Sequence, residues 1–243
     1  MIDRELLCSL SAEYGVTLDA VMLDKFTRYA ELLVDWNQRM NLTAITDPVG
    51  ITVKHFADSV TAVPFLPEKQ GISVIDVGTG AGFPGIPFAI VRPDIHLTLL
   101  DSLNKRLVFL ETVCKELDIP VTLIHARAEE GGRRAELREQ FDVATARAVA
   151  ALPVLLEYCL PFVKKGGCFV ALKGPDSEEE HRLSQNAQQR LGGKTKRMER
   201  LWLPKTIREG LEQQERRIFI FEKTAPTPSA YPRPSAKIAK APL

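Results

Sequence analysis

A glycine-rich turn with an acidic residue just before it is the first part of this sequence that could do chemistry. In VIDVGTGAGFPGIPFAI (74–90), a short apolar run leads into Gly78, Gly80 and Gly82, and Asp76 stands two residues before the first glycine. Glycine allows positive φ angles and a close approach of the backbone to a ligand. A carboxylate is an unfavourable neighbour for a pyrophosphate. The turn therefore favours a cationic ligand of the adenosine type.

Two prolines and two further acids help to predict which ligand the glycine turn binds. Pro84 and Pro87 crowd the start of the next helix, where a pyrophosphate would need free N–H donors. Asp101 follows the next apolar run, nineteen residues after Gly82, and is expected to accept the ribose hydroxyls, with a helix cap as the alternative. Glu129, in HARAEE, is either a polar contact near the adenine or a helix-start charge.

Regular alternation of apolar runs and helical segments predicts the fold that must position these residues. The runs lie at 72–77, 95–100, 121–125, 141–146 and 168–173, and each is followed by a helix-like segment, such as 104–117. This pattern indicates a parallel sheet covered on both faces. After a charged helix at 176–190, strands near 198–203 and 216–222 are expected to close the sheet as an antiparallel pair. The prediction is an α/β, Rossmann-like fold with a seven-stranded, mostly parallel sheet.

The segments before and after the sheet differ from it in composition. Residues 1–70 are predicted to be a helical extension, with an amphipathic helix over 19–38 and a second helix over 48–63. Residues 71–223 are predicted to form the methyltransferase-like sheet domain. Residues 224–243 are a proline-rich basic tail that we expect to be extended or disordered.

Charge is distributed unevenly along the chain, although its net value is only +1. Residues 1–66 carry five Lys or Arg against nine Asp or Glu, whereas residues 190–243 carry thirteen against five. A basic end suits a polyanionic partner, and a solvated surface is the alternative. The cations concerned are Lys194, Lys196, Arg197, Arg200, Arg216, Arg217, Arg233, Lys237 and Lys240.

The composition is that of an ordinary globular protein, with 45% hydrophobic and 26% charged residues. No apolar run is long enough to span a bilayer, and the N-terminus does not look like a signal peptide. The four cysteines are scattered without a CxxC pair, which favours buried thiols over disulfides or zinc. We therefore expect a cytoplasmic protein with no metal and no membrane partner.

The stretch VIDVGTGAGFPGIPFAIVRPDIHLTLLDSLNKRLVFLE resembles the signature of the bacterial RsmG (GidB) family, the S-adenosylmethionine-dependent 16S rRNA guanine-N7 methyltransferases. NLTAIT, HFADS, ATARAVA, ALKG and YPRP extend the resemblance over nearly the whole chain, although many relatives end in YPRKPG where this chain has YPRPSA. It implies a class I methyltransferase fold, S-adenosylmethionine as cofactor and 16S rRNA or the small ribosomal subunit as partner. No obligate protein partner is apparent.

By position, the resemblance also implies which residues contact the cofactor. They are Gly78 and Phe83 in the turn, Ala128 and Glu129 after the third strand, and Arg147 after the fourth.

Two residues are candidates for the substrate side. Lys173, at the end of the fifth strand, is expected to hold an RNA phosphate or the guanine O6 atom, with a surface ion pair as the alternative. His55, in KHFADS, is either a direct contact or a packed imidazole.

Guanine N7 requires little chemical assistance. Its in-plane lone pair carries no proton, so it can attack the sulfonium methyl directly and we expect no general base. Alignment is then the main task and can supply about 7–11 kcal/mol of barrier reduction. The RNA is expected to be held by the C-terminal cations.

Three rival functions share parts of these features. A small-molecule methyltransferase would use the same cofactor site without needing a basic end. A nicotinamide-dependent dehydrogenase would use a glycine turn, although Asp76 and the two prolines argue against it. A non-catalytic sensor of an adenosine ligand would bind the cofactor without transferring its methyl group.

Overall fold

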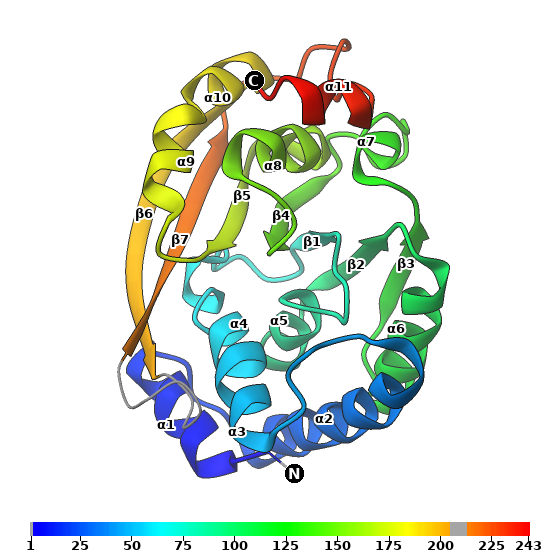
Figure 1. The fold of residues 1–243 in the computed structure, drawn as a ribbon, viewed down its shortest axis with the longest axis vertical. Helices are drawn as coiled ribbons and strands as arrows, with labels where there is room; N and C mark the ends of the chain where they lie inside the picture. Colours follow the sequence, from blue (N-terminus) through cyan, green and yellow to red (C-terminus); the bar gives the residue numbers. More distant parts are fainter. Residues whose placement is uncertain (1, 205–212) are drawn as a thin grey trace.

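Seven strands form one sheet in the computed structural model, which describes residues 2–204 and 213–243 (Figure 1). The strand order is β3-β2-β1-β4-β5-β7-β6. The first five strands are parallel, and β7 is antiparallel to both β5 and β6. The predicted fold class and the antiparallel closing pair are confirmed. The strands are β1 Ser73–Val77, β2 His96–Asp101, β3 Val121–His125, β4 Phe141–Arg147, β5 Val163–Lys173, β6 Gly193–Pro204 and β7 Gln213–Lys223.

Alternate side chains of the central strands are buried in two different cores. Val74 and Leu99 belong to one core, whereas Ile75 and Leu100 belong to the other. Because neighbouring strand residues point to opposite faces, both faces need a helical layer. Figure 1 shows α2, α5 and α6 on one side of the sheet and α7, α8 and α10 on the other. These helices are α2 Ala20–Met40, α5 Gly85–Val91, α6 Asn104–Glu116, α7 Ala128–Gly131, α8 Leu152–Cys159 and α10 Gln185–Leu191.

The region before β1 is helical, as predicted. It begins with α1, Arg4–Glu13, and continues with α2, whose first turn is capped by the Asp19 carboxylate, 2.8 Å from the Met22 N–H. A second helical run joins α3 (Pro48–Gly50), a π-helical segment (Ile51–Ala57) and α4 (Asp58–Val60). π-Helical turns are rare and often occur at functional sites.

The charged segment before β6 forms two helices instead of one. α9, Ser177–Leu183, and α10 are separated at Ser184, whose hydroxyl donates to the His181 carbonyl 2.7 Å away. The connection between β6 and β7, for which no helix was expected, lies outside the described residues. Among the described residues, no helix is both long and apolar enough to cross a lipid bilayer.

The expectation that the tail is extended or disordered is wrong. It contains α11, Ser235–Lys240, and Ile238 is completely buried against the body of the protein. The guanidinium of Arg138 donates to the carbonyls of Thr227 and Tyr231, at 2.7 and 2.9 Å. A proline-rich composition predicts disorder only when the segment has no surface to pack on. Here the tail is ordered because Arg138, outside the tail, binds the backbone carbonyls of the tail. The division of the chain at residues 70 and 223 stays a prediction.

Candidate cofactor and substrate site

The glycine turn begins where β1 ends and has the backbone conformation that its sequence predicts. Gly78, Gly80 and Gly82 have φ angles of 71°, 62° and 98°, in the left-handed region that favours glycine. The N–H groups of Gly78 and Thr79 donate to the Leu100 carbonyl at 2.8 and 3.1 Å, which ties the turn to the end of β2. A Cβ atom at Gly80 would meet no atom within 4 Å. The turn therefore has one open side, at Gly80.

Asp76 lies beneath this turn and is completely buried. Its Oδ2 atom accepts from the Thr79 hydroxyl at 2.7 Å and from the Gly85 N–H at 2.9 Å. Its Oδ1 atom has no hydrogen-bond partner. Burial raises the pKa of Asp76 to about 6. Asp76 thus supports the turn from inside and leaves one buried acceptor unused.

Asp101 and the α7 residues lie at the neighbouring strand ends. Asp101 Oδ2 accepts from the Gly80 N–H at 2.9 Å and from the Arg106 guanidinium at 3.3 Å, and Oδ1 accepts from the Leu103 N–H at 2.9 Å. Because each carboxylate oxygen can accept about two hydrogen bonds, capacity remains for a ligand. Glu129 is buried and Ala128 half-buried in the first turn of α7, just beyond β3. The structure brings the predicted ribose and adenine residues to one edge of the sheet.

Phe83, Arg147 and His55 form a stack beside the turn. The Arg147 guanidinium lies over the Phe83 ring at 4.8 Å, and the His55 ring stacks on Phe83 at 4.7 Å. His55 Nε2 lies 2.8 Å from the Thr43 hydroxyl and Nδ1 lies 3.4 Å from Arg147. Burial and the Arg147 charge lower the pKa of His55 to about 3. His55 is therefore a neutral, packed imidazole at neutral pH.

Asp58, at the start of α4, is a residue of this site that the sequence reasoning missed. Its Oδ2 atom accepts from Arg147 and its Oδ1 atom from Arg216 of β7, both at 2.9 Å. The aspartate is buried, so this is a nearly water-excluded triad of one acid and two arginines. The sequence did contain one indication that Asp58 belongs to the site. It follows His55 by three residues in HFADS, a spacing that puts both side chains on the same face of a helix.

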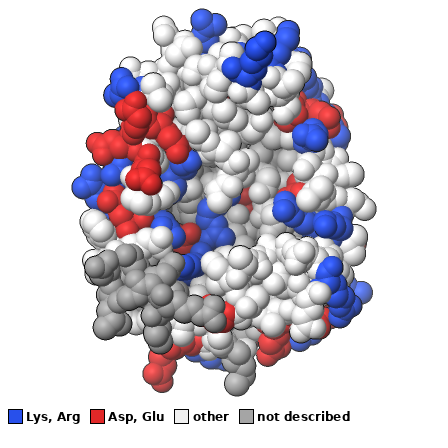
Figure 2. Space-filling model, in the orientation of Figure 1, with Lys and Arg blue, Asp and Glu red and all other residues white. Residues whose placement is uncertain are grey.

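A cleft of about 440 Å³ opens next to this triad, at the carboxyl ends of β4 and β5. Lys173 borders it, with its Nζ atom 2.9 Å from the Ala150 carbonyl and 2.8 Å from a Glu180 carboxylate oxygen. Figure 2 shows this face hollowed near its centre, with Lys and Arg side chains at the border of the hollow. The lining residues are Ile45, Lys54, His55, Asp58, Arg147, Ala148, Leu172, Lys173, Gly174, Pro175, Gln214 and Arg216.

Several of the C-terminal cations already have acidic partners. Arg217 is buried and pairs with Glu215 and Glu178, at 2.6 and 3.0 Å. Arg233 pairs with Glu157, which is completely buried.

Arg216 pairs with the buried Asp58, as described above, and two further C-terminal cations are paired near the surface. The four C-terminal lysines of the predicted group are exposed without such a partner among the described residues. Arg197 pairs with Glu199 and lies over the Phe65 ring, and Arg200 pairs with Glu215 at 3.2 Å. The exposed group comprises Lys194, Lys196, Lys237 and Lys240. The prediction that the basic C-terminal end is free to bind a polyanion therefore needs correction, because folding pairs most of its arginines with acidic residues.

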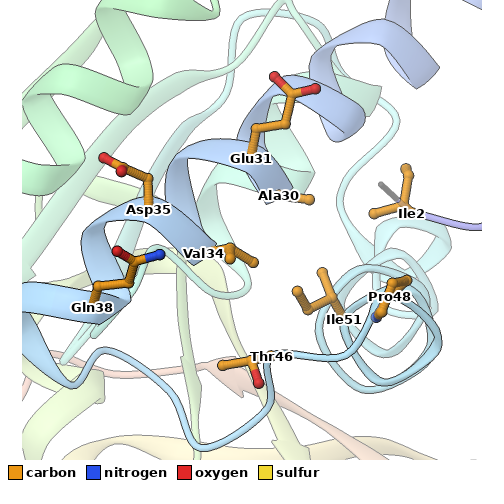
Figure 3. Close-up of a pocket in the computed structure, with 9 residues that line it drawn as sticks. All are labelled: Ile2, Ala30, Glu31, Val34, Asp35, Gln38, Thr46, Pro48 and Ile51. Atoms are coloured by element: carbon orange, nitrogen blue, oxygen red, sulfur yellow. The ribbon is translucent and has the colours of Figure 1, made fainter.

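A second cavity, of about 350 Å³, lies between α2 and α3 (Figure 3). Figure 3 shows Ala30 and Val34 of α2 on the side of Ile51 and Pro48, with Glu31, Asp35 and Gln38 farther from those two residues. All of its lining residues precede β1 in the chain. Because ligands of doubly wound sheets bind beyond the carboxyl ends of the strands, the cleft beside Arg147 is the better candidate site.

The residues at the turn fit S-adenosylmethionine. The open side at Gly80 leaves room for the ligand backbone, and Asp101 retains acceptor capacity for ribose hydroxyls. The unpartnered Asp76 Oδ1 places an acceptor below the turn, where a nearby positive charge is favoured.

Comparisons with known proteins agree with this geometry. The family model described as "rRNA small subunit methyltransferase G" matches residues 22–207. The chain is 48% identical over 241 residues to ribosomal RNA small subunit methyltransferase G of Acetivibrio thermocellus, covering 99% of this chain and 96% of the relative. It is 44% identical to the protein of that name from Bacillus velezensis, with 99% and 98% covered.

Solved structures of low sequence identity share the fold. One is a SAM-dependent O-methyltransferase from Thermotoga maritima, with a TM-score of 0.52, 19% identity and coverage of 81% of this chain and 73% of that one. Another is a precorrin-6y C5,15-methyltransferase from Geobacter metallireducens, with a TM-score of 0.51, 16% identity and coverage of 68% and 87%. The fold is that of S-adenosylmethionine-dependent methyltransferases, and S-adenosylmethionine is the cofactor. The chain belongs to the rRNA small subunit methyltransferase G family.

Proposed function

We propose that this protein, as an S-adenosylmethionine-dependent rRNA methyltransferase, methylates N7 of one guanosine in the 16S rRNA of the small ribosomal subunit. The observation that carries the proposal is family membership over nearly the full chain, combined with a cleft that opens beside the glycine turn at Arg147. With this substrate, the enzyme is expected to act in the cytoplasm.

The residues of the chain would hold two reactants in line. The turn at Gly78 and Gly80, with Asp101, Ala128 and Glu129 at the adjoining strand ends, would hold the cofactor, which supplies an electrophilic methyl group on a sulfonium sulfur. The cleft beside Arg147 would receive the guanine. The cofactor would supply the methyl group together with its positive charge, and N7 would accept the methyl group with its own lone pair while the sulfur leaves as a neutral thioether.

No proton has to leave N7, and the geometry around His55 suits such a reaction. Both ring nitrogens already face partners, Thr43 and Arg147, and the low pKa keeps the ring neutral. His55 would serve to pack Phe83 in place instead of accepting a proton. The buried carboxylate of Asp76, whose Oδ1 atom has no hydrogen-bond partner, would favour positive charge near the reacting atoms.

Methyl transfer from labelled S-adenosylmethionine tests this function directly. Naked 16S rRNA and small-subunit particles, both lacking the modification, are incubated with the enzyme, and the labelled nucleotide is mapped. We expect the label on N7 of one guanosine. Arg147→Lys, which keeps the charge but changes the stacking on Phe83, should label the same position more slowly. Label on other RNA atoms, on protein or only on metabolites would reject the proposal.

A further inference from the structure

The two sides of the site differ in charge. On one side, α9 begins with Glu178, Glu179 and Glu180, and the first two side chains are 68% and 61% exposed. Figure 2 shows this acidic group to the upper left of the hollow, where Figure 1 places α9. These glutamates pair with Arg217, Arg182 and Lys173. An RNA strand carries one negative charge per nucleotide, so a side whose cations are already neutralised by carboxylates attracts it weakly.

On the other side, the turns that follow β2 and β3 carry exposed cations. Lys105 stands at the start of α6, Arg127 just before α7, and Arg133 and Arg134 shortly after α7. None of these four forms an ion pair with another described residue, in contrast to most of the C-terminal arginines. Figure 2 shows Lys and Arg side chains to the right of the hollow, over the region where β2 and β3 end in Figure 1.

These two turns are fixed to each other and to the glycine turn. His125 pairs with Asp101 in the parallel register, and the Ala126 N–H donates to the Asp101 carbonyl at 3.2 Å. His125 Nε2 lies 3.1 Å from the Ser102 carbonyl. The Asp101 side chain accepts from the Gly80 N–H. Lys105 and Arg127 therefore stand on a fixed frame next to the predicted cofactor site. Arg133 lies beyond α7, where its guanidinium donates to the Ala230 carbonyl at 3.1 Å.

We propose that the surface formed by Lys105, Arg127, Arg133 and Arg134, the β2–β3 surface, binds phosphates of the RNA strand next to the target nucleotide. This inference rests on the proposed function and adds the path of the RNA over the protein surface. The strand would cross the cofactor side of the cleft instead of running along β6 and β7. Cations without acidic partners can bind phosphate without first giving up an ion pair, as Arg217 or Arg200 must.

A charge-matched pair of triple variants tests the β2–β3 surface. Lys105→Gln/Arg127→Gln/Arg134→Gln removes three of its charges. Lys69→Gln/Lys115→Gln/Lys165→Gln removes three exposed charges near the opposite, amino end of the strands. Methyl transfer to small-subunit RNA or particles is measured at several salt concentrations, and S-adenosylmethionine affinity is measured by calorimetry.

We expect the first variant to raise KM for the RNA substrate about tenfold. It should also reduce the slope of log binding constant against log salt concentration by about 2, because each lost contact to a single-strand phosphate contributes ~0.7 to that slope. Its cofactor affinity and thermal stability should match the wild type, and the control should change KM less than about twofold. Equal effects of the two variants, or a loss confined to cofactor affinity, would overturn the surface assignment. A wild-type enzyme that labels no guanine N7 would instead overturn the proposed function.

Discussion

The cofactor half and the substrate half of the site are held together by different kinds of contact. Around the glycine turn, backbone N–H groups donate to two carboxylates, Gly85 to Asp76 and Gly80 to Asp101. Around the cleft, side chains from three distant elements meet, with Asp58 between Arg147 and Arg216. The first half depends on backbone shape, and the second on the balance of buried charges.

This difference determines how each half can fail. A turn stabilised by its own backbone tolerates changes in neighbouring surface charge but not an added side chain. A triad of two arginines and one aspartate is sensitive to the loss of a single charge, since the remaining groups are then buried without compensation. The following changes are arranged from the largest expected effect to the smallest.

Asp58→Asn should have the largest effect because it removes the negative partner of two poorly exposed arginines. We expect the free energy of unfolding to fall by about 3–5 kcal/mol, measured by urea denaturation, with a loss of methyl transfer. Arg216→Gln is the control, because it leaves the Asp58–Arg147 pair intact and should cost clearly less stability. A larger loss from Arg216→Gln would show that Asp58 is not the centre of the triad.

Gly82→Ala should have the next largest effect, and Gly80→Ala is its matched control. A Cβ atom at Gly82 would lie 2.5 Å from the Tyr29 hydroxyl oxygen and 2.6 Å from Ile86, at a φ of 98°. Strain and overpacking together should destabilise this variant by about 2–4 kcal/mol. Gly80 has open space and a φ of 62°, so Gly80→Ala should cost only about 1–2 kcal/mol. Equal losses in denaturation would contradict the tight packing described at Gly82.

The buried Asp76 predicts a pH effect of intermediate size. Its pKa is raised to about 6 in the folded protein, so protonation favours the folded state. This contribution is complete below the ordinary pKa of 3.8 and is lost as the pH rises through about 6. Relative to Asp76→Asn, the wild type should therefore gain about 2 kcal/mol between pH 7.5 and 4.5, measured by urea denaturation at both pH values. A constant difference between the two proteins would contradict the raised pKa.

The sequence was sufficient to predict the fold and the conformation of the glycine turn, whereas the cofactor contacts stay predictions. Apolar runs and glycine positions are local signals, and the turn at Gly78–Gly82 is built from neighbouring residues. It was also sufficient to bring Asp101 to the same edge, because parallel strands end together. It did not reveal that Asp76 is buried beneath the turn, because the burial of a side chain depends on which other parts of the chain pack over it.

The substrate half was less predictable because its partners come from far apart in the chain. Arg147 was expected at the cleft, but its pairing with Asp58 joins residues 89 positions apart. Charge counts predicted a basic C-terminal end, but folding pairs Arg217 with Glu178 and Arg233 with Glu157. The exposed cations after β2 and β3 were not singled out, because they are few and lie in separate segments.

The smallest expected effect concerns the glutamates of α9, on the acidic side of the cleft. Glu178→Gln/Glu179→Gln removes two exposed charges from α9, and Glu68→Gln/Glu111→Gln removes two exposed charges elsewhere. If α9 repels the RNA, the first variant should lower KM for the RNA substrate about twofold at low salt, and the gain should vanish as salt screens it. The second variant should change KM much less. A rise in KM after removal of the α9 charges would mean that these glutamates help RNA binding, for example by orienting Arg217, and would reverse the assigned direction of the strand.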